Sequence, residues 1–187
     1  IRFTFASRLL KEKGIEVFIK SIEHFLLNFK HKNKIEFIIC GEFINDELIW
    51  KKENEFINHI KNFSKVIKYY GKLNDLNDIF KKSSAIVLPT FYGEGIPKIL
   101  CESLACGIPI ITTNQRGCRE LIDGNKNGLM CKSKDYKDLA KQFNNFLNFN
   151  DKEINTMSKN CIDFANKHFS ISEVSKAHEK IYKTILF

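Results

Sequence analysis

The chain has 187 residues, of which 43% are hydrophobic and 28% are charged, and its net charge is +8. This composition excludes an intrinsically disordered chain and favours a single globular domain of ordinary size. The longest apolar runs, such as residues 85–89, are no longer than a strand, so a membrane span is excluded as well.

Short β-rich runs alternate with helical patterns along the chain. We expect strands at residues 1–6, 35–40, 66–70, 85–89, 108–112 and 128–131. We expect helices at 15–29, 47–63, 76–82, 96–106, 136–149, 152–167 and 172–186, with a helical turn at 117–122. This alternation predicts an α/β fold with a Rossmann-like, doubly wound parallel sheet, whose ligand crevice lies at the carboxyl ends of the strands.

The last expected helix carries a stripe of apolar side chains at Ile171, Val174, Ile181 and Ile185. Such a stripe predicts a core-facing side, and docking on a domain outside this chain is the alternative. The chain opens on Ile1, already inside a strand-like run, so we expect it to be a piece of a longer polypeptide.

The basic residues are scattered over the expected outer faces of helices, without a cluster or a basic–aromatic alternation. We therefore expect a solvated surface and no nucleic-acid partner, although the same charges would support weak attraction to an anionic membrane. The six cysteines form no CxxC pair, and the spacing of metal ligands is absent. They are expected to be reduced, mostly packed thiols of a cytoplasmic protein.

The loop after the first strand, residues 7–14, is the first candidate site. It places Arg8 and Lys13 five positions apart beside a helix N-terminus, whose unpaired amides favour anions. A guanidinium fork and an ammonium suit phosphate oxygens, so together they would neutralise a diphosphate leaving group. A charged surface loop is the alternative.

The loop at residues 90–98 follows the most apolar strand and is the second candidate. Gly95 permits close backbone approach and Pro97 suits the first turn of a helix, which predicts an anion-binding nest. Glu94 precedes this helix and Glu102 lies within it, about 7.5 Å along the axis from Pro97. The two carboxylates are therefore expected at opposite ends of an elongated ligand, not as a close acid–base dyad. Helix-dipole complementation by Glu94 and a solvated Glu102 are the alternative.

Residues 112–128 form a third loop region, most of which is explained by turn chemistry. Cys118 lies near the start of a short helical turn and is expected to be packed, not reactive. A dinucleotide-binding motif starting at Gly93 fails because its third glycine would be Lys98. The sequence also lacks a P-loop, a nucleophile elbow and an Asp-x-Asp pair that could hold a metal.

Taken together, these loops resemble the C-terminal, donor-binding domain of retaining glycosyltransferases of the GT-B fold, specifically the large family four that acts on nucleotide sugars. The likeness extends over nearly the whole chain and depends on an ordered set of individually weak motifs. The matching residues are Arg8 with Lys13–Gly14, Gly41, Gly71, Leu88–Thr90, Glu94 with Glu102, residues 103–109, Gly117 with Glu120, and Asp123–Gly124 with Gly128.

This resemblance implies that residues 1–187 are the nucleotide-sugar-binding domain of a longer enzyme, whose N-terminal acceptor-binding half lies outside this chain. The implied catalytic residues are Arg8, Lys13 and Glu94, and the implied substrate-binding residues are Gly95, Ile96, Glu102, Lys72, Leu73 and Thr90. The cationic pair and nearby amides would hold the donor diphosphate, and Glu94 would lie by the transferred sugar. Glu102 would bind the ribose hydroxyls, and Lys72 and Leu73 would flank the base.

The resemblance further implies that no metal or cofactor is required, because cationic side chains supply the charge. The default donor is a UDP-sugar, and the acceptor a glycan or lipid-linked molecule of bacterial surface polysaccharide synthesis, at the inner face of the plasma membrane. The isolated fragment is expected to transfer nothing. Two departures stand out: Ser7 replaces a common glycine, and Pro97, which has no N–H, replaces another, which weakens the expected phosphate contact.

Two other classes remain open. A GT-B nucleotide-sugar 2-epimerase or a sugar phosphorylase would carry a different histidine and glutamate set or a cofactor lysine pocket, and neither is evident. A flavodoxin-like, non-catalytic nucleotide-binding module of the phospho-acceptor kind would need an acidic cluster after the first strand. This chain has Arg8, Lys11 and Lys13 at that place instead.

Overall fold

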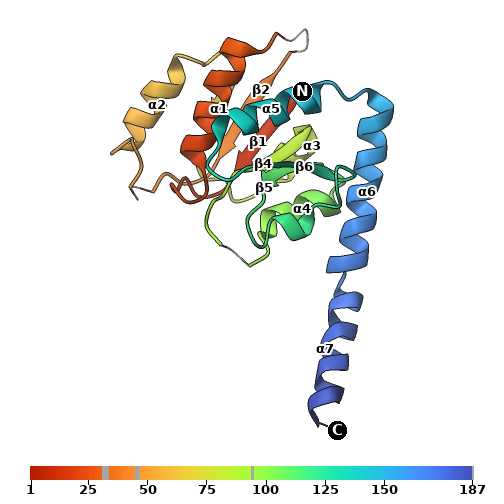
Figure 1. Ribbon diagram of the computed structural model, residues 1–187. Coiled ribbons are helices and arrows are strands. Elements are labelled where there is room, and N and C mark those ends of the chain that lie inside the picture. The colour runs from red at the N-terminus through yellow and green to blue at the C-terminus, as the bar shows by residue number, and fades with distance from the viewer. Residues whose placement is uncertain (31–33, 45–46, 94, 187) are drawn as a thin grey trace.

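The computed structural model describes residues 1–30, 34–44, 47–93 and 95–186 (Figure 1). Its strands form one parallel sheet in the order β3-β2-β1-β4-β5-β6. The strands are β1 (Arg2–Ala6), β2 (Glu36–Cys40), β3 (Ile67–Tyr69), β4 (Ala85–Leu88), β5 (Ile110–Thr113) and β6 (Gly128–Cys131). The order reverses between β1 and β4, which confirms the predicted doubly wound, Rossmann-like sheet and places its switch point beside β1.

Helices cover both faces of this sheet (Figure 1). They are α1 (Ile15–Asn28), α2 (Glu53–Lys61), α3 (Asn77–Lys82), α4 (Lys98–Ala105), α5 (Tyr136–Leu147), α6 (Asp151–Phe169) and α7 (Ile171–Leu186), with a 3-10 turn at Arg119–Leu121. Helices α1 and α5 pack together on one face, and α4 packs against α6 on the other. None of the described helices is both long enough and apolar enough to cross a lipid bilayer.

Alternation along β1 and β2 divides the core between the two faces. Phe3 and Phe37 point toward α1 and α5, where their rings lie 4.8 Å and 5.3 Å from the ring of Phe143, centroid to centroid. Ala6 and Ile38 point to the opposite face and pack near α3 and α4. A cluster of buried phenylalanine rings thus fills the layer between the sheet and the α1–α5 pair.

Two expectations from apolar spacing were wrong. The helix expected at 47–63 begins only at Glu53, because the segment before it is an irregular loop that buries Leu48 and Trp50 in the core. The stripe on the last helix does not face the core, since Ile171 is 86% exposed and Ile185 is 74% exposed. Helix α7 instead extends away from the sheet (Figure 1).

The cysteines are mostly packed thiols, as predicted. Cys118 is fully buried, and Cys40 and Cys161 are buried at the end of β2 and within α6. Burial raises the pKa of the Cys40 thiol to about 11 and that of Cys161 to about 12, so both are neutral at pH 7.

A charged cluster lies at the amino ends of β1, β2 and β3, at the edge of the sheet opposite the predicted crevice. Glu36 is 8% exposed, and its carboxylate accepts hydrogen bonds from Arg2 Nε and, at 2.9 Å, from Lys68 Nζ. These two hydrogen bonds lower the pKa of Glu36 from 4.5 to about 2. The cluster therefore stabilises the fold above pH 4.5, and that contribution disappears as the pH falls toward 2.

We expect Glu36→Gln to lower the free energy of unfolding at pH 7 by about 1–2 kcal/mol, a value reduced by solvent screening of the half-exposed partners. The difference from the parent chain should shrink as the pH falls from 4.5 toward 2. Urea denaturation across this pH range measures it. Glu179→Gln, on exposed α7, is the control and should change stability little at any pH. A difference that stays constant with pH would contradict the assignment.

Candidate functional site

Backbone contacts join the loops that leave β1, β2 and β3. The amide of Ser7 donates to the carbonyl oxygen of Cys40 at 3.0 Å, and the amide of Gly41 donates to Gly71 at 2.7 Å. Gly41 has a φ of 151°, and a Cβ atom there would lie 1.8 Å from the Ser7 carbonyl oxygen. Only glycine permits this approach, so the glycine after the second strand fixes the distance between two loops of the predicted crevice.

The loops that leave β1 and β4 are joined as well. The carbonyl oxygen of Glu12 accepts the amide of Phe91 at 3.0 Å and the hydroxyl of Thr90 at 2.9 Å. Gly14, at the start of α1, has a φ of 84°, and a Cβ atom there would lie 2.1 Å from the Pro89 carbonyl oxygen. The loop that carries Arg8 and Lys13 is therefore held against the end of β4 by glycine and threonine contacts.

A cavity of about 200 Å³ opens where the first three loops meet. Arg8, Lys72 and Leu73, three of the predicted site residues, lie in its wall together with Gly41 and Glu42. These residues come from three separate segments of the chain. The structure therefore places side chains that were expected to bind the diphosphate and to flank the base around one hollow at the carboxyl ends of β1 and β2.

The charges around this cavity favour an anion. Arg8 is exposed, and its guanidinium has no hydrogen-bond or ion-pair partner among the residues that the structure describes. Lys72 Nζ lies 3.1 Å from Glu42 Oε2, so these two charges largely offset each other. Cys40, also in the wall, is a neutral thiol because burial raises its pKa. The cavity wall therefore has a net positive charge, and the guanidinium of Arg8 carries it.

Lys13 and Thr90, also predicted site residues, do not line the cavity that contains Arg8. Lys13 is half-buried directly before Gly14 and is not part of the cavity wall. Thr90 is fully buried; its hydroxyl donates to Glu12, and its carbonyl oxygen accepts the hydroxyl of Thr113 at 2.6 Å. Thr90 thus supports the loops of the site, and the predicted contacts of both side chains with a substrate stay predictions.

The loop before α4 carries the second predicted group. Gly95 and Ile96 are exposed, Pro97 directly precedes the helix, and α4 begins two residues later than expected, at Lys98. Glu102 is half-buried on this helix, with its carboxylate 3.4 Å from Lys98 Nζ. Glu94, the predicted neighbour of the transferred sugar, lies outside the described residues.

Known proteins share this sequence pattern. The sequence profile of the family "Glycosyl transferases group 1" matches residues 1–167. The chain belongs to this family. The resemblance drawn from the ordered loop motifs is thereby confirmed.

Two relatives of this group 1 glycosyltransferase chain come from bacteria. The N,N'-diacetylbacillosaminyl-diphospho-undecaprenol alpha-1,3-N-acetylgalactosaminyltransferase of Campylobacter jejuni is 27% identical over 180 residues, which cover 96% of this chain and 44% of the relative. The UDP-Gal:alpha-D-GlcNAc-diphosphoundecaprenol alpha-1,3-galactosyltransferase of Escherichia coli is 28% identical over 165 residues, which cover 85% of this chain and 39% of the relative. The chain thus spans less than half the length of these relatives.

Solved structures confirm the fold of the group 1 glycosyltransferase chain. Alr3699/HepE of Anabaena in complex with UDP superposes with a TM-score of 0.79 at 17% identity, over 98% of this chain and 48% of that chain. The C-terminal domain of the group 1 family protein LpcC from Francisella tularensis superposes with a TM-score of 0.74 at 19% identity, over 91% and 86% of the two chains. The fold is the Rossmann-like half of a GT-B glycosyltransferase.

Sequence reasoning missed one charged residue in the site of this glycosyltransferase chain. Glu42 pairs with Lys72 and lies in the same cavity wall as Arg8. Its position directly after Gly41, at the end of a buried strand, is the signal that could have identified it. Among the described residues, no three His, Cys, Asp or Glu side chains gather as a metal site would require. The predicted independence from metal stays a prediction.

Proposed function

We propose that this chain is the donor-binding half of a retaining glycosyltransferase that takes a sugar from a nucleoside diphosphate sugar. The observation that carries the proposal is the exposed guanidinium of Arg8, unpaired within the described residues, in the wall of the cavity that Lys72 and Leu73 also line. A UDP-sugar is the proposed donor. A structurally similar Anabaena protein in complex with UDP, and a relative named for UDP-Gal, support this choice.

The proposed chemistry uses the positive charge of the first loop. When the bond between the anomeric carbon and the β-phosphate oxygen breaks, negative charge grows on the departing diphosphate. Arg8 and Lys13 would stabilise that charge, and the backbone amides of Gly95 and Ile96 would donate to the phosphates as well. We propose that these groups take the role of a metal ion, so that no metal and no resident cofactor is needed.

The remaining side chains would orient the donor. The base would lie between Lys72 and Leu73, where the wall of the cavity is part cationic and part apolar. Glu102 would accept hydrogen bonds from the ribose hydroxyls, because an ionised carboxylate only accepts. Glu94 would lie beside the transferred sugar and Thr90 at the strand end near it. One elongated donor molecule would then lie along the carboxyl ends of β1 and β4.

We further propose that the acceptor is a glycan or lipid-linked molecule of bacterial surface polysaccharide synthesis. Two relatives whose names specify diphospho-undecaprenol or diphosphoundecaprenol substrates support this. In the same proposal, a preceding half of the enzyme binds the acceptor. The enzyme then acts at the cytoplasmic face of the membrane. The isolated chain should then transfer no sugar by itself. Transfer at the rate of the longer enzyme would contradict the proposal that donor and acceptor are bound by two different halves.

Thermal unfolding with UDP, GDP, ADP and CMP at matched concentrations tests donor binding. At about one hundred times its dissociation constant, a nucleotide that binds only the folded chain adds about 2.7 kcal/mol of stability. For a domain of this size that raises Tm by about 5–10 °C. We expect the largest shift with UDP. No shift with any of the four nucleotides would contradict the proposed function, and a larger shift with another nucleotide would correct the base.

A further inference from the structure

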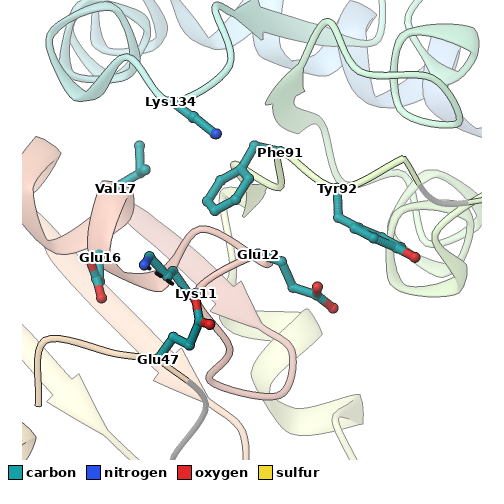
Figure 2. Close-up of a pocket in the computed structure, with 8 residues that line it drawn as sticks. All are labelled: Lys11, Glu12, Glu16, Val17, Glu47, Phe91, Tyr92 and Lys134. Carbon is teal, nitrogen blue, oxygen red and sulfur yellow. Dashed lines mark ion pairs between the residues drawn. The ribbon is translucent and has the colours of Figure 1, made fainter.

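A second and larger cavity lies at the same edge of the sheet, on the side of α1 (Figure 2). Its volume is about 620 Å³, which is within the usual range for small-molecule sites. Its walls come from the loops after β1, β2, β4 and β6 and from the first turn of α1. It shares no wall residue with the cavity that contains Arg8.

Two adjacent aromatic residues form part of this cavity. Phe91 lies in the middle of the side chains drawn in Figure 2 and is half-buried, whereas Tyr92 is 56% exposed. Lys134 Nζ lies over the Phe91 ring, 4.6 Å from its centroid. The exposed Tyr92 and the half-buried Phe91 each give the cavity wall an apolar ring against which a ligand can pack.

Charged groups of both signs surround these rings. Lys11 pairs with Glu47 at 3.6 Å, the dashed contact in Figure 2, and one oxygen of Glu16 accepts the amide of Ile49 at 2.8 Å. The carboxylate of Glu12 has no hydrogen-bond or ion-pair partner within the part of the chain that the structure describes. Three carboxylates against two lysines leave the cavity slightly negative, which disfavours a diphosphate.

The backbone is also unusual around this cavity. Outside glycine, the described residues contain two with a positive φ, Glu47 at 52° and Lys134 at 60°, and both lie in its wall. Such conformations are unfavourable for residues with a Cβ atom and collect at ligand sites, where the surrounding structure enforces them. In Figure 2 these two charged side chains lie on either side of Phe91, and each belongs to a loop from a different strand.

We propose that this cavity binds a neutral sugar ring of the acceptor glycan. Each hydroxyl of a sugar both donates and accepts hydrogen bonds, so it matches a wall that contains both carboxylates and ammonium groups. The C–H faces of the ring would pack on Tyr92 and Phe91. The slight negative charge disfavours phosphorylated ligands and favours an uncharged one.

That the cavity binds a sugar does not depend on the proposed function. That this sugar belongs to the acceptor does depend on it. Because the cavity lies at the same sheet edge as the Arg8 cavity, an acceptor ring held there would be near the donor. This inference assigns part of acceptor recognition to the same half of the enzyme that binds the donor.

Saturation-transfer NMR and titration calorimetry with the 187-residue chain test the site. The probes are methyl α-galactoside, methyl α-glucoside and methyl α-N-acetylgalactosaminide, with methyl α-galacturonoside as the anionic counterpart of the first. We expect at least one neutral glycoside to bind and the galacturonoside to bind about tenfold more weakly, because its carboxylate meets the carboxylates of the wall. Glu12→Gln and Tyr92→Ala should each weaken the neutral probe about tenfold.

Matched controls separate this inference from the proposed function. Tyr182→Ala removes a ring that is 62% exposed on α7 and should leave glycoside binding unchanged. Glu12→Gln should leave the UDP-induced thermal shift unchanged. Failure of all neutral glycosides to bind, or binding that survives both cavity variants, would overturn the inference. Displacement of the glycoside by UDP-glucose but not by UDP would also overturn it, because the cavity would then hold the donor's own sugar. Loss of nucleotide binding alone would contradict only the proposed function.

Discussion

Replacing Gly14 by alanine should lower the free energy of unfolding by about 4 kcal/mol, a large effect for a single methyl group. The left-handed conformation of this residue, with φ at 84°, costs about 1–2 kcal/mol for any residue with a Cβ atom. The added carbon would also lie 2.1 Å from the Pro89 carbonyl oxygen, so the loop after β1 would have to separate from the end of β4. Urea denaturation followed by fluorescence of Trp50, which is buried, measures the change.

The matched control is Gly124→Ala. Gly124 also has a positive φ, 58°, but a Cβ atom there would have no heavy atom within 4 Å. Its substitution should therefore cost only the conformational part, about 1–2 kcal/mol. Similar losses in the two variants would show that the contact between the two loops contributes nothing. The variant at Gly14 should also lose UDP affinity, because that loop positions Arg8.

The sheet could be predicted from the sequence because its signals are local. Each buried strand is a short apolar run that ends at a glycine or a polar residue, and the alternation with helices leaves few topologies. Residues 47–52 could not be predicted in the same way. Leu48 and Trp50 contribute to the core from an irregular loop, and their apolar spacing, read along the chain, resembles that of the following helix.

The site was predictable only where residues follow strand ends. Arg8 was identified from its loop, and Lys72 and Leu73 were implied by the resemblance to the family. The sheet order brings the segments that carry them together. The second cavity had no local signal, because its members come from four separate segments. Its form depends on long-range contacts between loops, among them the hydrogen bond from the Phe91 amide to the Glu12 carbonyl oxygen.

The exposed stripe on α7 illustrates a related limit. Helical periodicity correctly placed Ile171, Ile181 and Ile185 on one side of a helix, but periodicity gives no information on what lies against that side. These residues are exposed in the structure, and their helix extends away from the sheet. The helical period of apolar residues can be read from the local sequence, whereas their burial depends on which elements pack against them.

Replacing Arg8 by alanine should weaken the binding of UDP by about 10- to 100-fold, the largest effect on ligand binding that we expect. A hydrogen bond to a charged group contributes about 1.5–3 kcal/mol, and the Arg8 fork can give two of them to a diphosphate. The binding of uridine, which lacks the phosphates, should change by less than about twofold. Titration calorimetry with both ligands measures the two losses separately.

Two further variants define the cause. Lys176→Ala removes one positive charge from exposed α7, far from the cavity, and should leave UDP binding unchanged, which excludes an effect of net charge alone. Arg8→Lys keeps the charge but loses the planar fork, so it should recover only part of the affinity. Equal losses for UDP and uridine in Arg8→Ala would mean that Arg8 contacts the nucleoside or supports the loop. In that case Lys13 and the amides before α4 would have to hold the diphosphate and stabilise its charge.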